Sequence, residues 1–178
     1  MPTSNPDPIT YVCKRIIEIK PDSVLDVGVG FGKYGFLARE YTDIWNDRYW
    51  KEEWKCQIIG VEIFEPYVQN YHRDIYDSIL IYDAFDYLKI LCLDKSFDLI
   101  ICSDMVEHLP KEKGTELLKQ FARVGKTSIV IIPTQVRPQG PVHGNEFERH
   151  VASWTKEELE QFGNVLVLNE KVFILEIL

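Results

Sequence analysis

An acidic residue stands two positions before a run of closely spaced glycines near the start of the chain. Residues 24–35 read VLDVGVGFGKYG, with Asp26 in the apolar run and Gly28, Gly30 and Gly32 after it. A strand, a glycine-rich turn and a helix form a nucleotide-binding unit, because glycines let the backbone approach a ligand and the helix N-terminus is positive. Gly30, Gly32 and Gly35 also match the dinucleotide fingerprint, so glycines alone leave the ligand open. The Asp26 carboxylate would repel a pyrophosphate and suits a ligand that carries an ammonium group.

Three later apolar runs also end in acidic or polar residues. The run 58–63 places Glu62, followed by Ile63, where a second parallel strand would present a carboxylate to ribose hydroxyls. The other two runs end at Asp83 and Ala84, and at Ser103 and Asp104. Any one acid alone could equally cap the next helix or bind solvent. Four such ends in order fall on the edge of a parallel sheet where ligands bind, so they predict a ligand site there.

In these motifs the chain resembles the class I S-adenosylmethionine-dependent methyltransferases, whose first motif is an acid, any residue and then alternating glycines. The resemblance implies S-adenosyl-L-methionine as the cofactor, with Asp83 and Ala84 at the adenine amino group. It also implies that the segment from Met105 to Pro110 closes over the methyl donor. Ser103 and Asp104 complete the expected cofactor site.

An aromatic segment is inserted between the first two motifs. Glu62 lies 36 residues after Asp26, whereas roughly 20 residues are usual between a glycine loop and its ribose acid. The insert spans Tyr41 to Lys55 and carries several exposed-type aromatic residues, namely Trp45, Tyr49, Trp50 and Trp54. These rings could stack on a sugar or aromatic ligand, or they could cover the sheet edge as part of the core.

Apolar patterns typical of strands alternate along the chain with patterns typical of helices. This alternation predicts an α/β fold, a doubly wound Rossmann-like sheet that is mostly parallel and has about seven strands. Five strands are expected at 23–27, 57–62, 78–83, 97–103 and 127–132, and helices at 33–41, 65–73, 84–92 and 112–124. A capped helix is expected to follow Asp7 and Pro8, and a capping box at Thr155 and Glu158 opens a final helix. The runs 165–168 and 171–177 form a C-terminal antiparallel hairpin, whereas a dinucleotide fold would need a further crossover helix.

Three histidines are candidate catalytic bases for an oxygen acceptor. His108 follows the fourth strand, and His143 and His150 lie in the segment 133–154, which lacks periodicity and is long enough to suggest a functional loop. For each of them a surface or structural role is the alternative. The pattern from Asp104 to His108 also resembles the metal motif of small-RNA 2′-O-methyltransferases and some quinone-pathway O-methyltransferases, which leaves metal binding open, with His143 or His150 as a further ligand.

Length, composition and charge limit the number of domains and the kinds of partner and compartment that we expect. The chain of 178 residues is long enough for one domain, 1–178, and too short for a separate substrate domain. A net charge of −8 disfavours nucleic acid as a partner. We expect a cytoplasmic protein, because no apolar stretch approaches the roughly 20 residues of a membrane span and the start of the chain lacks a signal peptide's pattern. The four cysteines show no C-x-x-C spacing and are expected to be buried free thiols.

Together these features predict an S-adenosylmethionine-dependent methyltransferase that acts on a small-molecule or saccharide acceptor, with O-methylation favoured. Two alternatives stay open at this stage. One is a non-catalytic S-adenosylmethionine-binding or scaffold protein of the same fold, and the other is an NAD-dependent oxidoreductase. The sequence indicates neither the identity of the acceptor nor an oligomeric state.

Overall fold

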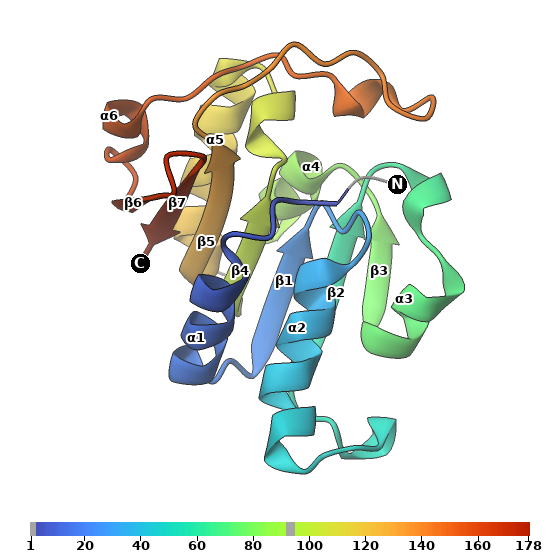
Figure 1. Ribbon diagram of the computed structural model, residues 1–178. Coiled ribbons are helices and arrows are strands. Elements are labelled where there is room, and N and C mark those ends of the chain that lie inside the picture. The colour runs from blue at the N-terminus through green and yellow to red at the C-terminus, as the bar shows by residue number, and fades with distance from the viewer. Residues whose placement is uncertain (1–2, 92–94) are drawn as a thin grey trace.

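A computed structural model describes residues 3–91 and 95–178 of the chain. Its centre is a seven-stranded sheet in the order β3-β2-β1-β4-β5-β7-β6 (Figure 1). The first five strands are parallel to one another, and β7 runs antiparallel to both β5 and β6. The α/β fold and the antiparallel C-terminal hairpin predicted from the sequence are therefore confirmed.

The strands are β1 (Ser23–Val27), β2 (Gln57–Glu62), β3 (Ser78–Ile81), β4 (Phe97–Ser103), β5 (Gly125–Pro133), β6 (Asn164–Leu168) and β7 (Val172–Ile177). The helices are α1 (Ile9–Ile19), α2 (Lys33–Thr42), α3 (Asn70–Ile75), α4 (Ala84–Ile90), α5 (Lys111–Val124) and α6 (Lys156–Leu159). Short 3₁₀ turns lie at Ile44–Asn46, Lys51–Glu53, Glu65–Tyr67, Val106–His108 and Glu146–Glu148.

Local sequence signals account for most of these boundaries. Thr155 and Glu158 form the predicted capping box of α6. Asn169 and Glu170 both adopt positive φ, which is the conformation that a two-residue hairpin turn requires. The N-terminal helix differs from the prediction, because Pro8 is its N-cap residue and no side chain caps it.

Three predicted elements have other bounds in the structure. The strand predicted for 78–83 ends at Ile81, because Asp83 turns away to cap α4. The helix predicted for 65–73 is divided into the 3₁₀ turn and α3, because Val68 and Gln69 between them are extended. The helix predicted for 84–92 ends at Ile90, and the last residue of that prediction lies outside the described residues.

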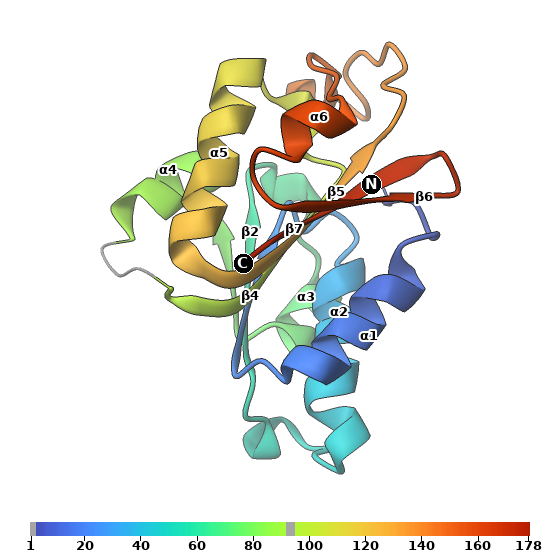
Figure 2. The same cartoon turned by 90° about the vertical axis from the view of Figure 1, so that its left-hand side faces the viewer.

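Helices cover both faces of the sheet. Figure 2 shows α1, α2 and α3 on one side and α4 and α5 on the other. Consecutive residues of β4 alternate between the two cores, since Leu99 packs with the α1 and α2 side and Ile100 with the α5 side. Both are fully buried, and burial of one such side chain stabilises the fold by about 1.5–3 kcal/mol.

The aromatic insert lies at the end of the sheet opposite to the carboxyl ends of the strands (Figure 1). It follows α2 and precedes β2, so it must lie where α2 ends and β2 begins. Its anchor is the buried Arg39, which pairs with Asp43 at 2.5 Å and with Asp77 at 2.7 Å, and whose guanidinium lies 4.0 Å from the Trp54 ring. The other three large aromatic residues of the insert, Trp45, Tyr49 and Trp50, are exposed.

Two further expectations can be compared with the structure. Cys13, Cys56 and Cys102 are buried free thiols, and Cys92 lies outside the described residues. Within the described residues, no helix combines the length and the apolar character needed to cross a membrane.

Candidate active site

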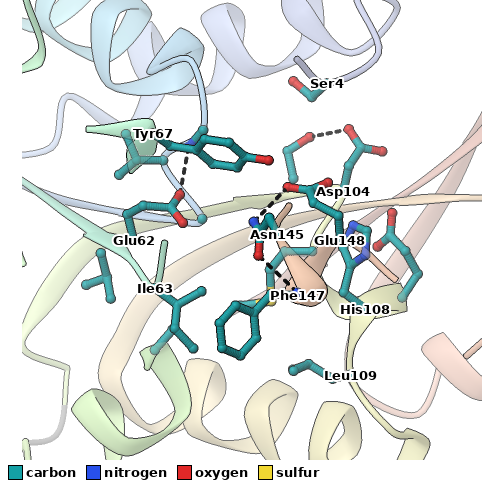
Figure 3. A pocket seen from close by; sticks show the side chains of 18 of the residues that line it. Ser4, Glu62, Ile63, Tyr67, Asp104, His108, Leu109, Asn145, Phe147 and Glu148 are labelled. Carbon is teal, nitrogen blue, oxygen red and sulfur yellow. Dashed lines mark hydrogen bonds between the residues drawn. The ribbon is translucent and has the colours of Figure 1, made fainter. Parts of the chain in front are cut away.

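A cavity of about 630 Å³ opens at the carboxyl ends of the parallel strands. This is the edge where open α/β sheets bind ligands. Most of the residues predicted for the site line it, namely Asp26, Gly28, Gly30, Glu62, Ile63, Asp83, Ala84, Ser103, Asp104, His108 and His150. Figure 3 shows Glu62 and Ile63 facing His108 and Glu148 across this cavity.

Asp26 lines the cavity and is only 3% exposed. Its Oδ2 accepts hydrogen bonds from the Gly35 N–H at 3.0 Å and from the Tyr76 hydroxyl at 2.5 Å. Burial raises the pKa of the Asp26 carboxyl to about 7, although these two hydrogen bonds act to lower it. A cationic ligand group would therefore meet a carboxyl that is poised to ionise.

The glycine loop brings backbone to the cavity wall. Gly28 and Gly30 have φ of 77° and 51°, a region that favours glycine. The Gly28 N–H donates to the Val61 carbonyl at 2.9 Å and ties the loop to β2. Gly32 does not line the cavity as predicted, because it is the N-cap residue of α2 and a Cβ there would lie 2.7 Å from the His72 ring on the outer side of the loop.

Glu62 ends β2 and fixes the loops on either side of it. Its Oε2 accepts from the Gly30 N–H at 3.0 Å (Figure 3), and its Oε1 accepts from the Phe64 N–H at 2.9 Å. Burial raises the pKa of the Glu62 carboxyl. Each carboxylate oxygen can accept a second hydrogen bond, so the side chain retains capacity for ligand hydroxyls.

Asp83 lines the cavity and also caps the N-terminus of α4. Its Oδ1 accepts from the Phe85 N–H at 2.8 Å, and its Oδ2 pairs with the Lys113 ammonium at 2.9 Å. This capping role is the alternative that the sequence left open for each strand-end acid.

Asp104 connects the cavity to the start of the chain. Its Oδ2 accepts from the Ser103 hydroxyl at 2.9 Å and from the Asn5 N–H at 3.3 Å. Lys33 donates to the Ser4 carbonyl and hydroxyl oxygens, and Ser4 itself lines the cavity. Sequence reasoning missed this N-terminal cover, because residues 3–8 carry no periodic signal.

Two of the three predicted histidines meet in the cavity. The ring centroids of His108 and His150 are 4.8 Å apart. The Nδ1 atom of His108 lies 3.1 Å from the Arg149 carbonyl oxygen, and that of His150 lies 2.6 Å from the Arg137 carbonyl oxygen. His143 is not among the described residues that line the cavity, because its turn has positive φ and leaves this residue exposed.

The loop 134–155 closes the cavity from above, crossing the strand ends in Figure 1. Its buried anchor is Asn145, whose Oδ1 accepts from the Phe147 N–H at 3.0 Å and whose Nδ2 donates to Glu148 at 3.4 Å. Asn145, Phe147 and Glu148 line the cavity, as do Gln139 and Tyr67. Gln135, Arg137, Glu146 and Arg149 are not among the described lining residues.

The aromatic insert takes no part in this cavity. Among its described lining residues, none comes from 41–55. Stacking of a ligand in this cavity on the insert's rings is therefore excluded, and Trp54 on Arg39 is the insert's contact with the core. The aromatic side chains that do line the cavity are Phe31, Tyr34, Tyr67, Tyr82, Phe85 and Phe147.

Comparisons with known proteins agree with the fold and the motifs. A family model described as "Methyltransferase domain" matches residues 25–132, which is more than half of the chain. The chain belongs to this family, the class I S-adenosylmethionine-dependent methyltransferases with a Rossmann-like fold. It is an S-adenosylmethionine-dependent methyltransferase. A comparison with curated proteins finds no match.

Solved structures show the same architecture. The PH0226 protein from Pyrococcus horikoshii OT3 is 18% identical, with a TM-score of 0.64 over 94% of this chain and 86% of that chain. A SAM-dependent methyltransferase from Aquifex aeolicus is 21% identical, with a TM-score of 0.61 over 97% and 93%. A SAM-dependent methyltransferase from Archaeoglobus fulgidus is 27% identical, with a TM-score of 0.51 over 73% of this chain and 55% of that chain.

The residues of the cavity fit the methyl donor that the family uses. S-adenosyl-L-methionine carries an ammonium, a ribose and an adenine, and the cavity offers a buried carboxyl at Asp26, a strand-end carboxylate at Glu62 and a glycine loop with positive φ. The ammonium and the ribose hydroxyls of the donor need hydrogen-bond acceptors, which the two carboxyl groups provide. The glycine loop lets the backbone approach the bound donor.

Proposed function

We propose that residues 1–178 form one methyltransferase domain that transfers a methyl group to an oxygen of a small-molecule or saccharide acceptor. The observation that carries the proposal is the division of the cavity. One side is formed by strand ends and the glycine loop, and the other by His108, His150, Asn145 and Glu148 with the exposed ring of Phe147. Hydrogen-bonding groups beside an aromatic face suit a hydroxylated acceptor.

In the proposed donor site Asp26 holds the ammonium, directly or through water, and Glu62 accepts from the ribose hydroxyls. Ile63 contributes apolar contact, and Asp83 with Ala84 lies at the adenine. Ser103 and Asp104 complete the wall nearest the methyl group. When bound, S-adenosyl-L-methionine supplies a methyl group on a positively charged sulfur, which is already activated for displacement.

The protein's main work is then alignment of the acceptor. In the reaction the acceptor oxygen forms a bond to the methyl carbon, the carbon–sulfur bond breaks with its electrons to leave a thioether, and the acceptor loses its hydroxyl proton. Without a bound metal ion, His108 and His150 can take up this proton. A carbonyl oxygen only accepts, so in a neutral ring Nδ1 carries the hydrogen and Nε2 keeps a lone pair. Burial also lowers the pKa of His108, which favours its neutral form.

The test is a screen that measures S-adenosylhomocysteine release with matched hydroxyl and amine acceptors, including simple sugars and phenols. Hydroxyl acceptors should support turnover and the amine analogues should not. In the presence of an active acceptor, His150→Asn should lower kcat by about a hundredfold, whereas donor affinity stays nearly unchanged. The exposed His143→Asn is the matched control and should retain wild-type kcat. Methylation of amines alone would overturn the choice of an oxygen nucleophile.

A further inference from the structure

We propose that Glu107, His108 and His150 form a binding site for one divalent transition-metal ion. Their ligand atoms all lie within 4.8 Å of one another, and all three residues line the cavity on its acceptor side. Glu107 and His108 belong to the 3₁₀ turn after β4, and His150 comes from the loop above the sheet. The site is thus built from two segments that are 42 residues apart in the chain.

The first observation that points to a cation is the state of Glu107. Glu107 is only 1% exposed, and its Oε2 has no hydrogen-bond partner among the described residues. A buried carboxylate oxygen without a partner is costly, so it normally has a hydrogen-bond donor or a cation beside it. Two histidines, His108 and His150, each place a ring nitrogen within 4.8 Å of a Glu107 carboxylate oxygen.

The second observation is the orientation of these histidines. Each ring places its Nδ1 against a backbone carbonyl oxygen, of Arg149 for His108 and of Arg137 for His150. Metal-binding histidines commonly donate their other ring N–H to a carbonyl or carboxylate, because this fixes the tautomer and the ring orientation. With Nδ1 placed against a carbonyl oxygen in each ring, Nε2 is the ring atom that would bind the ion.

The backbone holds the two segments together. The N–H groups of Val151 and Ala152 donate to the carbonyl oxygen of Glu107 at 2.9 and 3.0 Å. These bonds fix His150 next to the turn that carries the other two ligands. Two ligand atoms on one such ion lie roughly 3–4 Å apart, so the widest separation has to close by about 1 Å when the ion binds. Rotation of a half-buried histidine side chain is sufficient for this.

Two imidazoles and one carboxylate select the class of metal. This set favours Mn²⁺, Fe²⁺, Co²⁺ or Zn²⁺ over Mg²⁺ and Ca²⁺, which prefer oxygen ligands, and it leaves coordination positions open. In the proposed transfer reaction, on which this role rests, an acceptor hydroxyl at an open position would have its pKa lowered by the ion. The proton is then lost to solvent, since the Nε2 lone pairs are occupied by the ion.

The metal site can be tested without cofactor or acceptor. Protein that has been stripped with a chelator is titrated with Zn²⁺, Co²⁺ and Mg²⁺ by calorimetry, and Co²⁺ binding is also followed by its visible absorption. We expect one transition-metal ion per chain, with Mg²⁺ bound far more weakly. His150→Ala and Glu107→Gln should each weaken binding at least about tenfold, because loss of a ligand costs at least as much as loss of an outer-shell partner.

The exposed His143→Asn is the matched control and should bind metal as the wild type does. Circular dichroism checks that each variant is folded, and the half-buried His150 carries the test if Glu107→Gln unfolds. Absence of binding to the wild type at millimolar Zn²⁺ or Co²⁺, or undiminished binding by folded His150→Ala, would overturn the site while leaving methyl transfer untouched. With an active acceptor, chelation should abolish turnover and Mn²⁺ should restore it, and turnover indifferent to chelator would overturn the ion's catalytic role.

Discussion

The hydroxyl of Tyr76 donates a hydrogen bond of 2.5 Å to Oδ2 of Asp26, across 50 residues of sequence. Tyr76 directly follows α3, and Asp26 lies in β1. The Tyr76 ring occupies the space that a side chain at Gly35 would need, since a Cβ there would lie 2.1 Å from it. The buried Tyr76 thus fixes the position of the Asp26 carboxyl.

Affinity for S-adenosylhomocysteine should rise with pH through neutrality. The pKa of Asp26 in the free protein is raised to about 7 by burial, and a ligand ammonium favours the ionised carboxylate, so binding releases a proton below that pKa. We expect affinity to fall by up to about tenfold for each pH unit below 7. Calorimetry across this range is the measurement, and Asp26→Asn should bind weakly with a flat profile. A flat profile for the wild type would contradict the assignment of Asp26 to the ammonium.

The raised pKa of Asp26 has the opposite effect on the pH dependence of folding stability. Because the folded-state pKa of Asp26 lies above its unfolded value near 4, the folded state binds the extra proton and stability falls as pH rises from about 4 to 7. Asp26→Asn keeps an acceptor for Gly35 and Tyr76 and removes the buried charge. Without cofactor, this variant should therefore be more stable than the wild type well above pH 7, by on the order of 2 kcal/mol. Thermal melts at two pH values check this, and an Asp26→Asn variant that is less stable at both would refute it.

Tyr76→Phe should shift the pH dependence of donor binding to higher pH. The hydroxyl stabilises the ionised form of Asp26, so its removal lets the pKa of that carboxyl rise further. Affinity at neutral pH should fall several-fold. The readout is the midpoint of the calorimetric profile, which a purely structural role of Tyr76 would not move. Tyr49→Phe, in the exposed insert, is the control and should match the wild type.

Glu62→Ala should weaken S-adenosylhomocysteine binding by about 1.5–3 kcal/mol, the range for a hydrogen bond to a charged group. The ribose hydroxyls lose their acceptor, and the N–H groups of Gly30 and Phe64 lose theirs. The exposed Glu65→Ala on the same loop is the matched control and should bind normally. If both variants bind equally well, Glu62 serves only to hold its loops.

Arg39→Met should destabilise the protein by about 3–5 kcal/mol, because it leaves Asp43 buried without one of its charge partners. Asp43 retains Arg48 at 2.7 Å, which places the expected loss at the lower end of that range. Lys55→Met, on the exposed side of the insert, should change stability little. Urea unfolding gives both values, and donor affinity of the folded Arg39 variant should be unchanged because Arg39 does not line the cavity.

The sequence predicts those site residues whose position follows from their own strand or motif. Asp26 and Glu62 each end an apolar strand, and the parallel sheet brings such ends together without further information. Tyr76 could not be assigned in this way, because its contact with Asp26 depends on how α3 packs against α2. The one available signal was Gly35, a glycine inside a helix, which indicates close approach of another group.

The sequence predicts a functional loop at 133–154, but the geometry of that segment was not predictable. Asn145 and Phe147 reach the cavity and His143 does not, because a single turn with positive φ at His143 and Gly144 decides which side chains face inward. The two alternatives for the insert could not be separated from the sequence for a different reason. Its aromatic composition suits a sugar, but its place between α2 and β2 puts it at the opposite end of the sheet.

The most direct test of the donor site is a calorimetric titration of the wild-type protein with S-adenosylhomocysteine and, separately, with NAD at neutral pH. The buried carboxyl of Asp26 beside the glycine loop favours an ammonium and opposes a pyrophosphate. We therefore predict micromolar binding of S-adenosylhomocysteine at one site per chain and no comparable binding of NAD. Binding of NAD as tight as or tighter than that of S-adenosylhomocysteine would contradict this account of the cavity.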